Sequence, residues 1–164
     1  QRDRVDSHMH RNRRASGPFK GFQHKFSFCF RVDRKIDMIH PETDQIIQII
    51  DDSISVIKIL QQLLGQHLPH VKIRYALNGQ EGLKQVEAEQ PCVIILDYLM
   101  PDMTGIDVFR ELKTRYGKRV PPTIFLTGTP DPDIKRQMFD MGADDYLQKP
   151  VNQDDLLPRL SRFL

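Results

Sequence analysis

The chain has 164 residues and a mass of 19.2 kDa, enough for one domain with a substantial core and some additional sequence. Hydrophobic residues make up 39% and charged residues 28%, values that are ordinary for a globular protein and exclude a wholly disordered chain. No apolar run approaches the ~18 residues of a membrane span, and the N-terminus lacks the apolar segment of a signal peptide. We therefore expect a cytoplasmic protein without membrane contact.

The first 44 residues differ in charge from the rest. They hold ten Lys and Arg against six Asp and Glu, a balance of +4, whereas residues 45–164 have a balance of −2. Phe26–Phe30 alternates like a strand, but one strand without partners is only marginally stable. We predict that residues 1–44 are a basic arm that is disordered or artefactual, with a functional arm as the alternative, and that residues 45–164 form the domain.

From Ile46 onward, short apolar runs alternate with segments whose apolar residues are spaced as on a helix. The central run, Val93–Leu96, is continuous and ends at Asp97, which is typical of a strand buried on both faces. In chain order we predict strands at 46–50, 71–77, 93–97, 123–127 and 146–147. Helices are predicted to begin at Ser53, Asn78, Ile106, Asp131 and about Gln153, the last one running to the end of the chain through an awkward Pro158.

This alternation of strands and helices implies repeated right-handed βαβ units. The predicted fold class is therefore α/β, a doubly wound parallel sheet of five strands with helices on both faces. In such a sheet, ligands bind at the carboxyl ends of the strands.

Polar side chains follow four of the predicted strands at that edge: Asp51 and Asp52, then Asp97, Thr127 and Lys149. Three crowded carboxylates repel one another and favour a cation, and Mg²⁺ prefers carboxylate and phosphate oxygens. A lysine and a hydroxyl can hold the oxygens of a phosphoryl group. Together these groups predict an aspartate that accepts a phosphoryl group.

Each of these residues also has an ordinary structural explanation. Asp51 and Asp52 could complement a helix dipole, Asp97 could cap a turn, Thr127 could be a hydroxyl at a strand end, and Lys149 could be solvated. Their joint position at successive strand ends favours the functional interpretation.

The order of motifs over residues 45–164 resembles the receiver domain of bacterial two-component response regulators. Four stretches carry the resemblance: Ile49–Ser53 with the acidic pair, Leu96–Pro101 followed by Thr104-Gly105, Leu126–Gly128, and Gly142–Pro150 with its aromatic, lysine and proline. The resemblance implies a flavodoxin-like sheet in the strand order 2-1-3-4-5, with a cis bond before the proline.

The resemblance also implies roles for individual residues. Asp97 would accept the phosphoryl group from a sensor histidine kinase or phosphotransfer protein. Asp52, Asp97 and the backbone carbonyl of Leu99 would ligate Mg²⁺, with Asp51 acting through water.

Three further residues would respond to the phosphoryl group. Lys149 would pair with one of its oxygens, Thr127 would move to bond another, and Tyr146 would turn inward behind Thr127. The change would be read out on the face formed by the fourth helix, the fifth strand and the fifth helix. The same face could form a phosphorylation-dependent homodimer.

Two other function classes are alternatives to a receiver that accepts a phosphoryl group. An aspartate-nucleophile phosphatase on a related fold is expected to carry a second acid two residues after the nucleophile, where this chain has Leu99. A degenerate receiver that only binds proteins is disfavoured by the intact acidic residues, Thr127 and Lys149. We expect no enzyme activity beyond the domain's own phosphorylation and dephosphorylation, and nucleic-acid binding only through an output domain outside this sequence.

The lifetime of the phosphoryl group depends on two positions. Leu99 and Thr129, two residues after Asp97 and Thr127, would flank the path of the attacking water. Neither side chain can act as a general base. General-base assistance is typically worth about 10²–10⁴-fold in rate. We therefore predict slow hydrolysis, with Leu99 shielding the phosphorus.

Overall fold

The computed structural model describes residues 45–129 and 131–164. The predicted arm at residues 1–44, including Phe26–Phe30, lies outside the described residues. Within the described ranges, no helix is long and apolar enough to cross a membrane.

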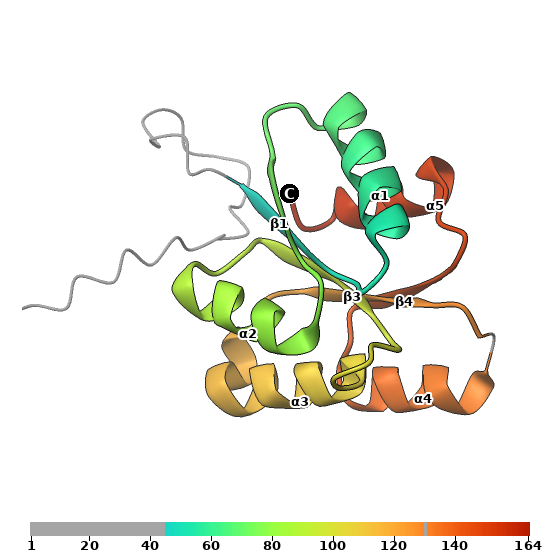
Figure 1. Cartoon of the computed structure of the whole chain (residues 1–164). Helices are drawn as coiled ribbons and strands as arrows, with labels where there is room; N and C mark the ends of the chain where they lie inside the picture. The colour runs from blue at the N-terminus through green and yellow to red at the C-terminus, as the bar shows by residue number, and fades with distance from the viewer. Residues whose placement is uncertain (1–44, 130) are drawn as a thin grey trace, which may run out of the picture.

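Strands and helices alternate along the described chain as the sequence predicts (Figure 1). The strands are β1 (Ile46–Ile50), β2 (Lys72–Ala76), β3 (Val93–Asp97), β4 (Thr123–Thr127) and β5 (Asp145–Gln148). The helices are α1 (Ile54–His67), α2 (Gly79–Ala88), α3 (Gly105–Tyr116), α4 (Pro132–Asp140) and α5 (Gln153–Leu160), with a short 3₁₀ turn, η1 (Gly117–Arg119), after α3.

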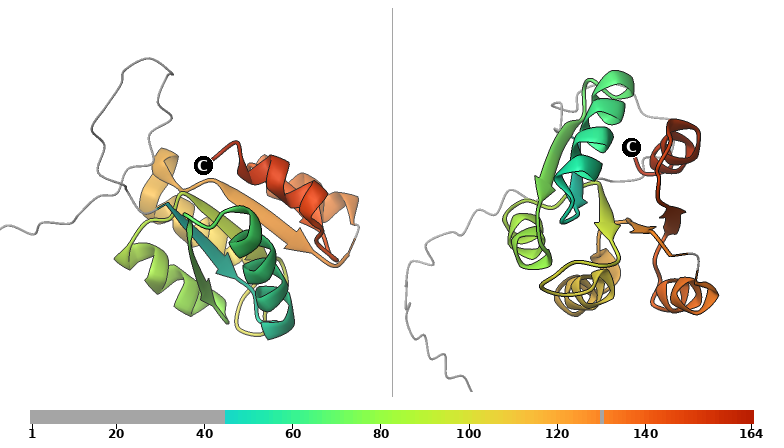
Figure 2. Two further views of the ribbon diagram at one scale, coloured as in Figure 1. Left: turned by 90° about the horizontal axis from the view of Figure 1, so that it is seen from above. Right: turned by 45° about the vertical axis from the view of Figure 1, so that its right-hand side comes forward.

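In this part of the molecule, five parallel strands form one sheet in the order β2-β1-β3-β4-β5. Helices α1 and α5 cover one face of the sheet, and α2, α3 and α4 cover the other (Figures 1 and 2). Every residue of β1, β3 and β4 is buried, because these strands have neighbours on both sides and helices on both faces. The predicted fold class and strand order are confirmed.

Successive residues of the central strands enter two different cores. Ile95 and Ile124 pack against α1 and α5, whereas Leu96 and Phe125 face the helices on the opposite side. Phe125 meets Phe109 of α3 edge to face, with ring centroids 5.6 Å apart. The sheet is therefore packed between two layers of helices.

The last helix is shorter than predicted. It ends at Leu160 and is followed by a turn. Pro158 lies inside this helix and has no N–H group to continue the hydrogen-bonding pattern. The turn, closed by a bond from the Phe163 N–H to the Leu160 carbonyl, packs Phe163 and Leu164 against the core of α1 and α5. Partial burial of these two residues replaces the last turn of helix, residues 161–164, that the prediction contained.

Candidate functional site

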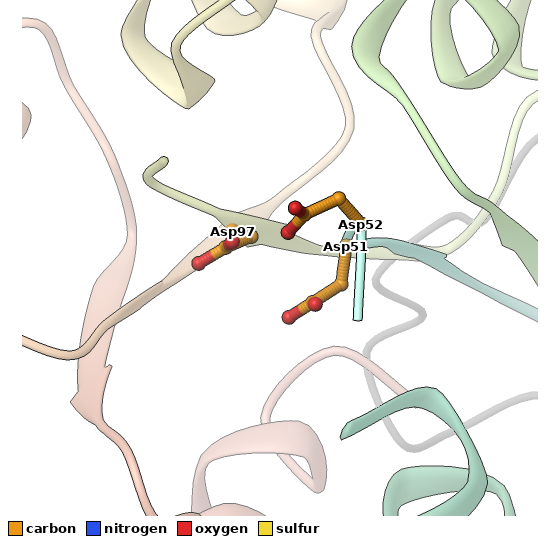
Figure 3. A group of neighbouring side chains, drawn as sticks. All are labelled: Asp51, Asp52 and Asp97. Atoms are coloured by element: carbon orange, nitrogen blue, oxygen red, sulfur yellow. The ribbon is translucent and has the colours of Figure 1, made fainter. Parts of the chain in front are cut away.

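Three carboxylates meet where β1 and β3 end (Figure 3). Ile50 pairs with Leu96 in the sheet, so the residues that follow them, Asp51 and Asp97, lie side by side. One oxygen from each of Asp51, Asp52 and Asp97 lies within 4.8 Å of the others. Asp51 and Asp97 are buried and Asp52 is exposed, so the group opens to solvent on one side.

Lys149 joins this group from the end of β5. Its Nζ donates a hydrogen bond to Asp51 Oδ2 at 2.7 Å and lies 2.9 Å from Asp97 Oδ1. The backbone of Lys149 is held by a bond from its N–H to the Thr127 carbonyl, and the peptide bond to Pro150 is cis. One ammonium therefore bridges acids from two different strands.

The two oxygens of Asp51 are both engaged. Oδ1 accepts the N–H of Ser53 at 2.8 Å, and Oδ2 accepts Lys149. The protein itself therefore holds the Asp51 carboxylate in place, whereas Asp52 is exposed.

The charges of the site are unbalanced. Burial raises the pKa of Asp97, and nearby Asp51 adds to this, against the opposing effect of Lys149. Burial lowers the pKa of Lys149, but the hydrogen bonds to Asp51 and Asp97 outweigh it and raise the pKa above its ordinary value. With every group ionised, three carboxylates and one ammonium leave two negative charges uncompensated. Carboxylate oxygens with that charge fit a divalent cation such as Mg²⁺.

Thr127 ends β4 with its hydroxyl engaged in the loop that follows. The hydroxyl donates to the Thr129 carbonyl at 3.0 Å and accepts the Thr129 N–H at 3.1 Å. Thr127 and Tyr146 line a pocket of about 250 Å³ between β4, α4 and β5. Tyr146 is partly buried, with Lys135 Nζ 4.3 Å from the centre of its ring and Phe139 edge to face with it.

Leu99 lies in the loop between Asp97 and Gly105. It faces Thr104 in an isolated antiparallel bridge, and the Gly105 N–H donates to the Tyr98 carbonyl at 2.8 Å. Leu99 is 58% exposed. More than half of its surface is therefore in contact with solvent.

The structure thus brings Asp51, Asp52, Asp97 and Lys149 together and places Thr127 and Tyr146 at the adjoining pocket. Sequence reasoning did not find Asp102, which connects the Leu99 loop to α2. No local pattern in the sequence indicates a contact between Asp102 and a residue 23 positions away.

Comparison with known proteins agrees with this geometry. Residues 47–161 match the family described as the response regulator receiver domain. The chain is 31% identical over 118 residues to the alkaline phosphatase synthesis transcriptional regulatory protein PhoP of Bacillus subtilis, covering 72% of this chain and 48% of that protein. It is 34% identical over 137 residues to a probable cyclic di-GMP phosphodiesterase of Vibrio cholerae, covering 82% and 30%. The chain spans about half the length, or less, of the curated relatives it matches.

A solved structure has the same architecture. The chemotaxis protein CheY4 of Vibrio cholerae is 29% identical, with a TM-score of 0.67 over 73% of this chain and 98% of that one. The sheet order, the acids at the strand ends and the match over residues 47–161 lead to one family. This chain belongs to the receiver domains of two-component response regulators.

Proposed function

We propose that Asp97 accepts a phosphoryl group from a phosphohistidine of a sensor histidine kinase or phosphotransfer protein. A carboxylate oxygen of Asp97 attacks phosphorus, a P–O bond forms as the P–N bond breaks, and the electron pair leaves with the imidazole. The observation that carries this proposal is the position of Asp97 at the end of a buried strand, 2.9 Å from Lys149 and beside two further carboxylates.

Asp52, Asp97 and the backbone carbonyl of Leu99 would hold Mg²⁺, and Asp51 would contribute through water. Support comes from the three oxygens within 4.8 Å of one another and from the uncompensated negative charge. When bound, the ion supplies positive charge to the phosphoryl oxygens. Lys149, already directed at Asp97, would donate a hydrogen bond to one of those oxygens.

Thr127 and Tyr146 would act as the switch. The Thr127 hydroxyl would exchange its bonds to Thr129 for one to a phosphoryl oxygen, and Tyr146 would turn into the pocket behind it. Phosphorylation would thereby shift the population between two states of the same fold. The readout surface would be α4, β5 and α5, where exposed Phe139 lies against Tyr146 and offers apolar area for a homodimer or a target.

The rest of the signalling route follows from the family. The domain would work in the cytoplasm, would catalyse only its own phosphorylation and dephosphorylation, and would control a downstream target or an output domain. Relatives that share the receiver are named as a transcriptional regulator and as a phosphodiesterase, so the receiver alone does not specify the output.

Incubation of the full chain with acetyl phosphate and Mg²⁺ tests the proposal. We expect one phosphoryl group by intact-mass spectrometry, none on Asp97→Asn, and unchanged labelling of Asp140→Asn, which replaces an exposed acid on α4. Labelling that persists in Asp97→Asn, or that continues undiminished after chelation of the metal, would refute it.

A further inference from the structure

The loop that follows Asp97 is attached to the first turn of α2. The two carboxylate oxygens of Asp102 accept the backbone N–H groups of Gly79 at 3.2 Å and Gln80 at 3.1 Å. These are N-terminal helix amides, which have no partner within the helix and favour negative charge. Burial raises the pKa of Asp102, but the N–H groups of Gln80 and Gly79 outweigh it, so the pKa is lowered overall.

An apolar contact supports the same attachment. A Cβ atom on Gly79 would lie 2.5 Å from Met103 Cγ and 2.7 Å from Val108 Cγ2. The missing side chain of Gly79 therefore lets Met103 pack directly on the helix. The Gln80 side chain also contacts the Met103 sulfur at 3.7 Å. We call Asp102, Met103, Gly79 and Gln80 the α2 clamp.

The loop from Tyr98 to Thr104 doubles back on itself, and the clamp holds its tip. At the base of the loop, the Gly105 N–H donates to the Tyr98 carbonyl and Leu99 faces Thr104. The exposed side chain of Leu99 makes little packing that could fix its own backbone. The position of the Leu99 carbonyl therefore depends on how the base and the tip of the loop are held, and the clamp holds the tip.

We propose that Asp102 is a positioning residue for the metal site, because the α2 clamp holds the loop that presents the Leu99 carbonyl to Mg²⁺. This inference rests on the proposed function, in which that carbonyl is a metal ligand. By linkage, the coupling is reciprocal, so Mg²⁺ must tighten the clamp as much as the clamp raises affinity for Mg²⁺. A partner that occupies the start of α2 would then change metal affinity at the carboxylates.

Calorimetric titration of the full chain with MgCl₂ measures the first half of the coupling. We expect Asp102→Ala to raise the Kd about fivefold, because the loop then visits the metal-competent arrangement only part of the time. Asp102→Asn keeps one acceptor and should have a smaller effect. Asp133→Ala is the matched control, since it removes an acid from the first turn of α4 and should leave the Kd unchanged.

Amide hydrogen exchange measures the other half and does not depend on activity. In the wild type, the N–H groups of Gly79 and Gln80 should exchange more slowly with saturating Mg²⁺ than without it. In Asp102→Ala, Mg²⁺ should not change their exchange rates. Gly79→Ala is a second variant that keeps Asp102 and separates Met103 from α2, and it should also weaken Mg²⁺ binding.

The outcomes separate this inference from the proposed function. If the wild type does not bind Mg²⁺, or Asp52→Asn binds it equally well, the proposed metal site is wrong. If the wild type binds Mg²⁺ through Asp52 but Asp102→Ala has the same Kd, the clamp has no positioning role. A lower melting temperature in Asp102→Ala with an unchanged Kd would overturn the inference in the same way, as would Mg²⁺-independent exchange at Gly79 and Gln80.

Discussion

Replacing Gly105 with alanine should directly disturb Asp97, the proposed phosphoacceptor. Gly105 is the buried first residue of α3, and a Cβ atom there would lie 2.2 Å from the backbone oxygen of Asp97. It would also lie 3.1 Å from the Phe125 ring, which is held in the core. Neither neighbour is the free end of a flexible side chain, so the backbone itself has to move.

The size of the effect follows from these contacts. Real Cβ atoms essentially never approach within 3.0 Å, so the strand end and α3 must separate by about 0.8 Å. Overpacking of this kind typically costs about 1–3 kcal/mol, and weakening the bond from Gly105 to Tyr98 adds about 1 kcal/mol. The lower chain entropy of alanine offsets roughly 0.5–1 kcal/mol. We therefore expect a net loss of about 1–3.5 kcal/mol in the free energy of unfolding, and a phosphorylation rate roughly tenfold to hundredfold lower.

Urea unfolding and the rate of labelling by acetyl phosphate provide the assay. Gly65→Ala is the control, because a Cβ at this position of α1 meets nothing within 4 Å and alanine should stabilise the helix by about 0.5–1 kcal/mol. If Gly105→Ala unfolds and is phosphorylated like Gly65→Ala, the close approach to Asp97 does not constrain the site.

Three of the remaining predictions concern the site and its loop, and one concerns the arm. Mg²⁺ at 100 times its Kd should stabilise the domain by about 2.7 kcal/mol in thermal unfolding, an effect that Asp52→Asn should largely remove; equal stabilisation of both proteins would place the ion elsewhere. Leu99→Asn should speed decay of the phosphorylated protein in Mg²⁺ at neutral pH, and an unchanged decay rate would mean that Leu99, 58% exposed, does not shield the phosphorus. The lowered pKa of Asp102 means that its contribution to stability is present above the unfolded-state value of about 3.9 and is lost as pH falls through the folded-state pKa. The difference in the free energy of unfolding between wild type and Asp102→Asn, measured with urea, should therefore shrink as the pH falls from 7 to ~3. A difference that stays constant would show that the charge of Asp102 is not its source. Deletion of residues 1–37 should leave the melting temperature and phosphorylation unchanged, whereas a loss of several degrees would show that Phe26–Phe30 packs on the domain.

Local patterns in the sequence were sufficient to predict the elements of the domain. Ser53, Asn78 and Asp131 were predicted to start helices, and each caps one by accepting backbone N–H groups of the first turn. The strands begin and end within a few residues of their predicted limits, because a continuous apolar run bounded by polar residues is a property of neighbouring positions. The end of α5 was predicted wrongly, since packing of Phe163 on the core is not a local property.

The sequence by itself also determined that acids, a hydroxyl and a lysine follow successive strands, and the parallel order of those strands makes the groups converge. Only the tertiary structure decided which of these groups touch. Lys149 reaches Asp51 across 98 positions of the chain, and Asp102 reaches Gly79 across 23. Such contacts depend on where the connecting helices return the chain, so residue patterns over a few turns carry no information about them. The physical reason is that helix and strand signals come from hydrogen bonding and burial between near neighbours, whereas the distances at the site are set by the packing of the whole sheet between its two layers of helices.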